Sequence, residues 1–410
     1  MSPAPIIVVG GGLAAGTLVT QLRERGHDGE VVLLTEEAHA PYERPPLSKD
    51  LLLGKTEPQS AAVHDDDGWY PEHGIELRTS TAATAIDPAA RRVQAGGDWL
   101  DYSDLVLATG SRPRRMAMAD EVADEVADEV ADESGAAVFY LRTLDDSLEL
   151  RERLHAGARI GIVGGGWIGL EVASAARQHD AEVTLLESLD LPLLRVLGPE
   201  VAQVFADLHR EHGVDLRTGA QITGISAHGH ADAGGITMAL ADGAAFDVDA
   251  VVVGVGIQPN VELADEAGLT VDNGIRTDAR LRTSDEHVHA IGDVANADHP
   301  VLGYPVRVEH WDTAIKHAKA LAATLTGTPT EATDLPYFFT DQYDLGMEYV
   351  GHPGPEGYDR VVLTGDVPGR VFRAWWLRGD TVVAGMHVND WDAIDEVRRL
   401  VGTSDGLPPA

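Results

Sequence analysis

The chain has 410 residues, which is too long for one ordinary hydrophobic core, and we expect three domains. Its 31 lysines and arginines against 67 aspartates and glutamates give a formal net charge of −36, which repels phosphate backbones and anionic lipids and argues against nucleic-acid and membrane-surface roles. The absence of cysteine excludes disulfides, thiolate metal sites, cysteine-held iron–sulfur clusters and thiol nucleophiles.

No stretch of the sequence approaches the roughly 20 apolar residues that a membrane helix needs. The apolar run at residues 6–9 has neither the basic segment nor the cleavage-like end of a signal peptide. We therefore expect a cytoplasmic protein without a membrane segment, in which any redox chemistry runs on a bound cofactor.

Residues 5–37, PIIVVGGGLAAGTLVTQLRERGHDGEVVLLTEE, predict a buried strand, a tight glycine turn, an amphipathic helix and a second strand that ends in acid. The turn has Gly10 and Gly12, with Ala15 at the third position of the pattern. Glycines let the backbone approach a pyrophosphate, and Glu36 is placed to accept hydrogen bonds from ribose hydroxyls. Such turns also form for packing reasons, but the complete strand–turn–helix–strand unit predicts a dinucleotide site.

Two segments follow with different characters. Residues 102–114, YSDLVLATGSRPR, predict an apolar strand that runs into a Thr-Gly turn, and the basic RPRR at its end is typical of a domain junction. Residues 119–133, ADEVADEVADEVADE, repeat with a period of four, which places acids at i and i+4, where like charges repel along a helix. We therefore expect a mobile, solvated insertion there rather than a packed element.

Residues 158–187, ARIGIVGGGWIGLEVASAARQHDAEVTLLE, repeat the same order of elements. This turn completes the full pattern with Gly164, Gly166 and Gly169. A carboxylate at Glu187, which ends the next strand, suits a free ribose hydroxyl and repels a 2′-phosphate, so the sequence favours NADH over NADPH. The nearby Arg195 leaves NADPH open. Two such turns, 154 residues apart, imply two dinucleotide-binding domains.

Residues 247–260 and 287–295 predict further buried strands that end in glycine-containing turns. From about residue 326 the pattern changes to short alternating strands and a final amphipathic helix near 391–401, which predicts a small α+β domain. The predicted fold class is α/β, with two Rossmann-like dinucleotide-binding domains and a small C-terminal α+β domain. His209 and His212 have helical i, i+3 spacing, but nothing beside them supports a metal, so we expect a solvated helix face and no metal.

Taken together, the motifs resemble the two-dinucleotide flavoproteins and, within that family, the oxygenase-coupled ferredoxin reductases. The resemblance covers nearly the whole chain. It rests on APYERPPLSK (40–49), LVLATGSRPR (105–114), YLRTLDD (140–146), GGGWIGLEVA (164–173), GIQPN (256–260), AIGDVA (290–295), VEHWDTA (308–314) and DQYDLGMEYVG (341–351).

The resemblance implies an FAD-binding domain in two parts, 1–112 and 245–325, around an NAD-binding domain at 113–244, with a C-terminal domain at 326–410. It implies that NADH passes a hydride to FAD and that reduced FAD passes single electrons to an iron–sulfur ferredoxin that serves an oxygenase. Because the chain lacks cysteine, the thiol-dependent reductases and peroxidases of the family are excluded, and the electrons must leave to an external acceptor.

The resemblance also assigns residues. It places Lys49 and Glu171 beside the flavin, where the lysine stabilises reduced flavin and the glutamate holds that lysine and the nicotinamide amide. Without it, Lys49 reads as a surface charge and Glu171 as an acid in the first turn of a helix. The remaining assignments to cofactor contact are Asp293 at the ribityl chain, Glu309, His310 and Trp311 near the isoalloxazine edge, Arg44 and Arg142 at FAD phosphates or ribose, Val255 and Gly256 at the nicotinamide, and Ala14, Ala83, Thr109, Gly110 and Ile168.

Two alternatives remain open. The same two cofactor sites suffice for an NADH oxidase or quinone reductase, and a redox-sensing flavoprotein that resembles apoptosis-inducing factor would also carry them. The sequence does not decide between a monomer and a homodimer.

Overall fold

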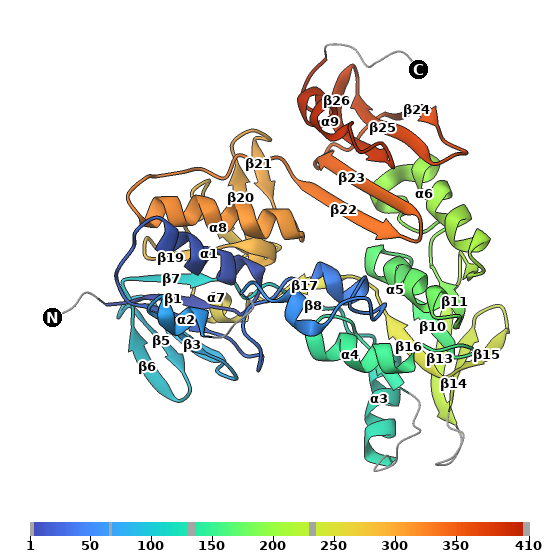
Figure 1. Cartoon of the computed structure of the whole chain (residues 1–410), viewed down its shortest axis with the longest axis horizontal. Helices are drawn as coiled ribbons and strands as arrows, with labels where there is room; N and C mark the ends of the chain where they lie inside the picture. Colours follow the sequence, from blue (N-terminus) through green and yellow to red (C-terminus); the bar gives the residue numbers. More distant parts are fainter. Residues whose placement is uncertain (1–3, 65–67, 130–136, 229–234, 405–410) are drawn as a thin grey trace. The chain divides into compact units, whose positions relative to one another are not determined.

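The computed structural model describes residues 4–64, 68–129, 137–228 and 235–404. The chain divides into two compact units, and each is assembled from three separate segments. The first unit comprises Met1–Arg44, Pro58–Arg112 and Gln258–Phe338; the second comprises Pro45–Glu57, Pro113–Ile257 and Phe339–Ala410. Figure 1 shows the elements of both units with their labels.

The first unit is built on a five-stranded parallel sheet in the order β19-β7-β1-β2-β3. Its strands are β1 (Ile6–Val9), β2 (Val31–Leu34), β3 (Ile75–Arg78), β7 (Asp104–Leu107) and β19 (Val288–Ala290). β1 and β2 are apolar and buried at every position, as expected for parallel strands that are covered on both faces. On one face, α1 (Leu13–Glu24) lies beside α8 (Trp311–Leu325), and their apolar sides pack against Ile6 and Val8.

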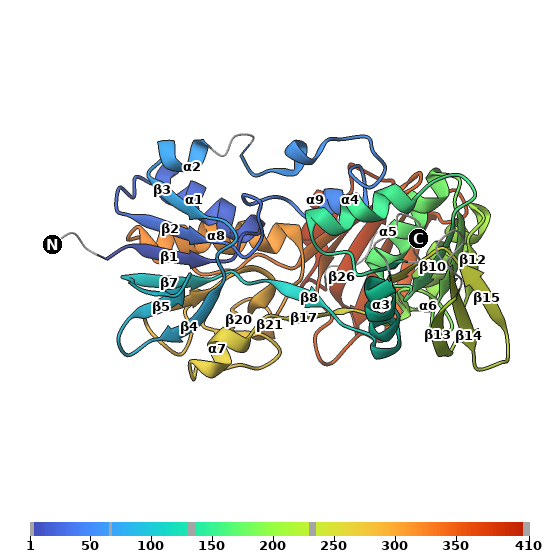
Figure 2. The ribbon, with the colours of Figure 1, turned by 90° about the horizontal axis from the view of Figure 1, so that it is seen from below.

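The other face of this sheet packs against a small antiparallel sheet. Figure 2 shows α1 and this small sheet on opposite sides of β1 and β7. The small sheet consists of β4 (Ala83–Asp87), β5 (Arg92–Ala95) and β6 (Asp98–Asp101), and α7 (Glu262–Glu266) packs beside it. The rest of the unit is made of α2 (Trp69–Glu72), β18 (Ile275–Thr277), β20 (Ala295–His299), β21 (Tyr304–Val306) and the 3₁₀ turns η2 (Pro58–Ala61) and η3 (Gly292–Val294). Chain segments that pass between the units form the two-stranded pair β8 (Ser111–Pro113) and β17 (Ile257–Pro259).

The second unit contains another five-stranded parallel sheet, in the order β12-β11-β10-β16-β9. Its strands are β9 (Ala137–Phe139), β10 (Arg159–Val163), β11 (Glu182–Leu186), β12 (Asp215–Arg217) and β16 (Ala250–Val253). The helices are α3 (Ala117–Glu129), α4 (Leu144–Arg153), α5 (Trp167–Gln178) and α6 (Leu194–Glu211); η1 (Pro45–Ser48) and the antiparallel strands β13 (Ile222–His228), β14 (Gly235–Leu240) and β15 (Ala245–Val248) complete this part. α6 is broken at Gly198, whose φ of 76° and ψ of 169° are not helical, because the following Pro199 disfavours a helical residue before it.

The same unit ends in a five-stranded sheet in the order β22-β23-β26-β25-β24, with antiparallel pairing from β23 to β24. The elements are β22 (Tyr337–Gln342), β23 (Leu345–Gly351), β24 (Arg360–Asp366), β25 (Val371–Arg378), β26 (Thr381–Val388) and α9 (Ile394–Leu400). Phe372, Trp375 and Trp376 on β25 are almost fully buried and form the core of this region. Trp376 also donates from its indole Nε1 to the carbonyl of Leu197 on α6 at 3.1 Å.

The predicted fold class is confirmed: two βαβ units open two parallel sheets, and a small α+β region ends the chain. The residue boundaries of the two cofactor-binding domains stay predictions.

The prediction for the ADEV repeat is wrong within its described part. Residues 117–129 form α3, and Ala119 and Val122 lie in a buried hydrophobic cluster within the second unit. The repeat places alanine and valine at i, i+3 and i+4, which gives a helix one apolar stripe. Repulsion between exposed acids costs only about 0.2–0.5 kcal/mol per pair, whereas burying a valine contributes about 1.5–3 kcal/mol, so packing prevails. Residues 130–133 of the repeat lie outside the described residues.

Candidate active site

The first glycine turn joins β1 to α1 in the first unit. Gly10 has a φ of 122°, and a Cβ there would lie 2.1 Å from the carbonyl oxygen of Ala108, so only glycine fits. Gly12 is the N-cap of α1, where no side-chain cap is formed among the described residues, and a Cβ on it would meet nothing within 4 Å. The uncapped N–H groups and the space beside Gly12 fit a dinucleotide pyrophosphate.

The second glycine turn joins β10 to α5 in the second unit. Gly164 has a φ of 103°, and a Cβ on it would lie 2.4 Å from the carbonyl oxygen of Gly254. Gly166 is the N-cap of α5, again with no side-chain cap among the described residues. A Cβ on Gly169 would lie 2.0 Å from the carbonyl oxygen of Gly164, whereas Ala15 at the matching position of the first turn is accommodated in the core. The second turn therefore also fits a pyrophosphate, and its own packing requires glycine at positions 164 and 169.

The acids that follow the two turns differ in their surroundings. Glu36 lies two residues beyond β2 and is exposed. Glu187 directly follows β11 and is only 9% exposed. Its Oε2 accepts a hydrogen bond from the backbone N–H of Gly165 at 2.7 Å, and its Oε1 accepts one from the N–H of Leu189 at 2.8 Å. The second carboxylate is thus fixed against its own glycine turn.

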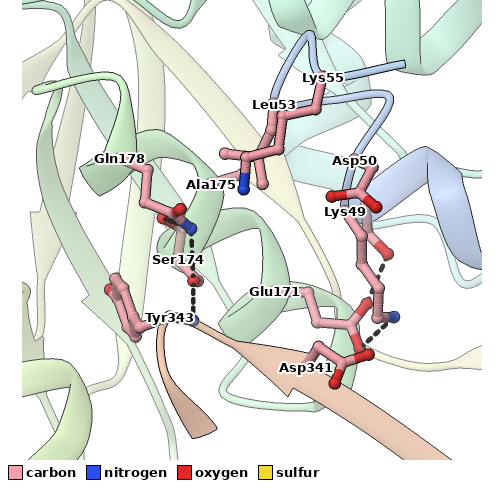
Figure 3. Close-up of a pocket in the computed structure, with 11 residues that line it drawn as sticks. Lys49, Asp50, Leu53, Lys55, Glu171, Ser174, Ala175, Gln178, Asp341 and Tyr343 are labelled. Atoms are coloured by element: carbon pink, nitrogen blue, oxygen red, sulfur yellow. Dashed lines mark hydrogen bonds and ion pairs between the residues drawn. The ribbon is translucent and has the colours of Figure 1, made fainter. Parts of the chain in front are cut away.

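Lys49 and Glu171 form an ion pair within the second unit (Figure 3). Lys49 directly follows η1, and Glu171 lies in the second turn of α5, so it is not the first-turn acid that the alternative interpretation required. The Lys49 Nζ lies 2.7 Å from Glu171 Oε1, and Glu171 is 4% exposed. A buried ion pair persists when further hydrogen bonds satisfy its charges, which makes the other partners of Glu171 important.

Two buried hydroxyl groups supply those hydrogen bonds. Ser48 Oγ donates to Glu171 Oε2 at 2.5 Å, and Thr340 Oγ1 on β22 donates to Glu171 Oε1 at 2.5 Å. The carboxylate therefore accepts from three donors, one of them charged. The Lys49 ammonium also lies 5.5 Å from the centre of the Phe339 ring, in a cation–π contact.

A cavity of about 260 Å³ opens beside the ion pair. It runs along the face of α5 from Glu171 past Ser174 to Gln178 (Figure 3). Asp341 also lines it, and burial, together with repulsion from Glu171 and other carboxylates, raises the pKa of Asp341 although Lys49 opposes the shift. The ion pair is thus reachable from a polar cavity.

The first unit gathers several of the other predicted residues. A Cβ on Gly292 would lie 3.1 Å from the Cβ of Ala14, so the turn that carries Asp293 lies beside the first glycine turn. The Thr109–Gly110 turn is held by Asn260, which donates from Nδ2 to the carbonyl of Thr109 at 2.7 Å.

The remaining predicted residues of the first unit lie at element ends or in its packing. Arg44 donates from Nη2 to Glu37 Oε1 at 2.8 Å. Glu309 pairs with Arg307, and His310 and Trp311 are the N-cap and the first residue of α8. Ala83, at the start of β4, packs in the core on the opposite face of the sheet from α1.

In the second unit, apolar side chains flank the second turn. Ile168 is 41% exposed and Val255 is 40% exposed, although both are large and apolar. Gly256 has a φ of 103°, and its carbonyl accepts from the N–H of Arg114 at 2.9 Å. Arg142 lies two residues before α4, and its N–H donates to Asp146 Oδ2 at 3.0 Å. The exposed apolar surface beside the turn fits a flat cofactor ring.

Comparison with known proteins identifies the family of this chain. The model of the pyridine nucleotide-disulphide oxidoreductase family matches residues 4–318, and that of the reductase C-terminal domain matches residues 337–410. The ferredoxin–NAD(+) reductase component of the anthranilate 1,2-dioxygenase system of Burkholderia cepacia is 39% identical over 404 residues, which are 98% of this chain and 95% of that protein. Putidaredoxin reductase of Pseudomonas putida is 36% identical over 405 residues, 98% of this chain and 92% of that protein.

Among solved structures, the covalent complex of putidaredoxin reductase with putidaredoxin contains a chain that superposes with a TM-score of 0.91 at 35% identity, covering 98% of this chain and 94% of that one. The chain belongs to the pyridine nucleotide-disulphide oxidoreductase family. It is an oxidoreductase, and membership implies FAD and a nicotinamide dinucleotide as cofactors. Within the described residues, no helix is long and apolar enough to cross a membrane, and no cluster of histidine and acidic residues is arranged to hold a metal.

The sequence did not single out three residues that contact or face the ion pair of this oxidoreductase, namely Ser48, Thr340 and Asp341. Ser48 directly precedes Lys49, so the PPLSK motif already contained it. Thr340 lies 169 residues from Glu171, and no local pattern reveals such a contact. The prediction of a solvated face for His209 is wrong, because the side chain is fully buried and its Nε2 lies 2.8 Å from Gln342 Oε1 on β22.

Proposed function

We propose that the protein is an NADH-dependent ferredoxin reductase that supplies electrons to an oxygenase. The observation that carries the proposal is the ion pair between Lys49 and the buried Glu171 in a chain without cysteine. A flavoprotein of this family that lacks a redox thiol has no internal acceptor and must deliver its electrons to another molecule. The names of the relatives, a ferredoxin–NAD(+) reductase component and a putidaredoxin reductase, support an iron–sulfur protein as that acceptor.

FAD, when bound, supplies the conversion between two-electron transfer from a nicotinamide and one-electron transfer to an iron–sulfur centre. We assign FAD to the first turn, with Gly10 and Gly12 at the pyrophosphate, Glu36 at the ribose and Asp293 at the ribityl chain. The proximity of Ala14 to Gly292 supports this grouping. The FAD domain would comprise residues 1–112 and 245–325, with the C-terminal domain at 326–410.

The nicotinamide dinucleotide is assigned to the second turn and to residues 113–244. The exposed apolar side chains of Ile168 and Val255 would contact the nicotinamide, together with Gly256. Glu187 would accept hydrogen bonds from ribose hydroxyls. Because its carboxylate is held by backbone N–H groups, it cannot swing away from a 2′-phosphate, which supports NADH as the donor.

In this proposal Lys49 provides a fixed positive charge at the flavin, and Glu171 orients both Lys49 and the nicotinamide amide. A preorganised charge costs no reorganisation at the moment of reaction, so it contributes more than a mobile one. The use of NADH also fits the cytoplasmic location predicted from the sequence.

The test is steady-state turnover of the FAD-loaded protein with NADH. Two-iron ferredoxins, followed through cytochrome c reduction, should be reduced much faster than quinone or dioxygen. Equal rates with all three acceptors would contradict the proposal and favour an oxidase or quinone reductase. A long-lived flavin–NAD complex that no ferredoxin discharges would instead favour a redox sensor.

The role of Lys49 has its own test. Lys49→Met should slow flavin reduction by NADH roughly a hundredfold, the usual cost of removing one preorganised charge. Lys319→Met, at an exposed lysine of α8, is the matched control and should behave as the native protein. Native kinetics in Lys49→Met would remove the pair from the flavin.

A further inference from the structure

We propose that Thr340, Gln342 and His209 are positioning residues that form a one-directional chain of hydrogen bonds ending on Glu171. The inference rests on the proposed function, in which Glu171 orients Lys49 and the nicotinamide. None of the three residues was expected to act at this site, and Thr340 and Gln342 belong to β22, a strand of the C-terminal sheet.

The chain is continuous and buried. Thr340 Oγ1 lies 2.5 Å from Glu171 Oε1, Gln342 Nε2 lies 3.2 Å from Thr340 Oγ1, and His209 Nε2 lies 2.8 Å from Gln342 Oε1. Tyr343 OH lies 3.4 Å from His209 Nδ1. Thr340 and Gln342 are each 1% exposed, and His209 is fully buried, so water does not compete for these bonds.

The direction of each bond follows from the Glu171 end. A carboxylate paired with an ammonium can only accept, so Thr340 must donate its single hydroxyl hydrogen to Glu171. The oxygen of Thr340 is then an acceptor, and Gln342 must turn its NH₂ group toward it. This orientation leaves Gln342 Oε1 facing His209, which must supply a hydrogen from Nε2.

His209 completes the same pattern. Burial lowers its pKa to about 4, with the nearby His212 adding to the effect and the bond to Gln342 opposing it, so the ring is neutral at pH 7. A neutral ring with hydrogen on Nε2 has a bare Nδ1, which accepts from Tyr343 OH. Burial raises the pKa of Tyr343, which therefore keeps its hydrogen. Every donor in the chain thus points toward Glu171.

The turn between β22 and β23 holds this chain in place. Tyr343 at its tip has a φ of 56°, which is rare for a tyrosine. Its N–H donates to Ser174 Oγ on α5 at 3.0 Å (Figure 3), and its ring stacks on His212 of α6 with centroids 3.7 Å apart. These two contacts hold the turn after β22 against α5 and the end of α6. The hydrogen-bonded strand β22 therefore places Thr340 beside Glu171.

Aligned hydrogen bonds polarise one another, so the Thr340 hydroxyl is a stronger donor with Gln342 behind it than it would be alone. Without it, Glu171 Oε1 would keep Lys49 as its partner, and Ser48 would still donate to Oε2. The carboxylate would then be held by one donor fewer, and its contact with a nicotinamide would be less well oriented. The chain therefore acts on the rate of flavin reduction and not on the binding of the rest of the dinucleotide.

The test compares variants of the FAD-loaded protein in stopped-flow reduction by NADH. Thr340→Val keeps the shape of the side chain and removes the hydroxyl, and we expect a limiting reduction rate roughly ten- to a hundredfold lower, as for loss of a hydrogen bond to a charged group. The apparent dissociation constant for NADH should stay within about twofold, because the second glycine turn binds the other half of the cofactor. Thr340→Ser restores the hydroxyl and should restore most of the rate.

A matched control separates positioning from general loss of stability. Thr277→Val removes a buried threonine hydroxyl of the first unit that has no hydrogen-bond partner among the described residues, and it should leave the limiting rate unchanged. Gln342→Met should lower the rate in the same direction as Thr340→Val and by a smaller factor. A native limiting rate in Thr340→Val, or a loss that Thr340→Ser does not repair, would overturn the proposal.

A second measurement does not depend on turnover. In ¹⁵N NMR of protein labelled at histidine, with His209 assigned by its absence from His209→Gln, the ring should be neutral at pH 7 with hydrogen on Nε2. The Nδ1–H tautomer or a protonated ring would break the chain of donors and overturn the inference. If NADH fails to reduce the native flavin, the proposed function fails, while the tautomer still decides whether the chain exists. If NADH reduces the flavin but no ferredoxin accepts the electrons, only the acceptor is wrong and both tests stand.

Discussion

The two glycine turns perform the same structural task in the two units, yet they tolerate different residues. In the first turn, Ala15 occupies the third position and the following acid, Glu36, is exposed. In the second turn, Gly169 has no room for a Cβ, and Glu187 is held by the backbone of the turn itself. The difference teaches that two turns of the same shape can hold the following acid differently: the acid of the first turn is exposed, whereas that of the second is fixed by backbone N–H groups before any ligand binds.

The largest expected effect comes from breaking the second turn at its third glycine. Gly169→Ala places a methyl group 2.0 Å from a carbonyl oxygen, so the helix must move away from the turn. We expect a loss of roughly 3 kcal/mol in the free energy of unfolding, typical of an overpacked site, and at least a hundredfold weaker binding of NAD⁺. Urea unfolding and calorimetric titration of the FAD-loaded protein measure the two effects. An unchanged NAD⁺ affinity would show that this turn does not hold the cofactor.

Acid should destabilise both units, because each contains a histidine whose pKa burial lowers to about 4, His317 on α8 in the first unit and His209 on α6 in the second. Since the pKa of His209 is lowered to about 4 from about 6.5, the unfolded chain binds more protons between these two values, and stability falls as the pH drops through that window.

The corresponding loss is about 3 kcal/mol between pH 6.5 and 4, and stability above pH 6.5 is unaffected by this group. Hydrogen exchange followed peptide by peptide at pH 7 and pH 5 should show protection lost around α6 and β22 in the second unit and around α8 in the first. Unchanged protection around α6 and β22 at pH 5 would contradict the prediction. The His209→Gln variant should show a shallower dependence of unfolding free energy on pH.

Removing the negative charge of Glu187 is expected to have a smaller effect, on the preference for NADH over NADPH. Glu187→Gln abolishes the repulsion of a 2′-phosphate, and we expect the NADH/NADPH ratio of kcat/KM to fall about tenfold, or about 1.4 kcal/mol. Glu36→Gln is the matched change at the first turn and should leave this ratio unaltered, with FAD binding weakened only a few-fold. A ratio that responds to Glu36 and not to Glu187 would reverse the assignment of the two turns.

The smallest effect is expected from making the first turn resemble the second. Ala15→Gly adds backbone freedom within α1 and removes one buried methyl group, which should cost about 1–2 kcal/mol of unfolding free energy. The FAD content of the purified protein, read from its absorbance, should not change. A loss of FAD would show that the first turn depends on the residue at its third position, as the second turn does.

Much of the fold could be predicted because local sequence patterns indicate its two parallel sheets. Apolar runs such as Ile6–Val9, followed by glycine turns and helical periodicity, are sufficient to predict both βαβ units. The prediction of a mobile insertion at 119–133 was wrong for the described part of the repeat. It considered the repulsion between the acids and not the apolar stripe that the same period creates. The prediction of a solvated His209 was wrong because its hydrogen-bond partner, Gln342 on β22, lies more than 130 positions later in the sequence.

The residues of the candidate site also fall into those that the local sequence predicts and those that it does not. The residues of the glycine turns could be predicted because their roles depend on backbone shape, which a short sequence encodes. Lys49 and Glu171 could be paired only through the resemblance to a family, since 122 residues separate them. Thr340 and Gln342 escaped prediction because ordinary polar residues in a strand carry no signal until the tertiary contact exists.

The interrupted course of the first unit has a consequence for how the protein is made. The first sheet requires β19, at residues 288–290, to pair beside β7, whereas every strand of the second parallel sheet lies between residues 137 and 253. During synthesis, the strands of the second sheet have therefore all left the ribosome while the first sheet still lacks its fifth strand. The parallel sheet of the first unit is thus the later of the two parallel sheets to receive all its strands, because the pairing of β7 with β19 bridges more than 180 residues of sequence.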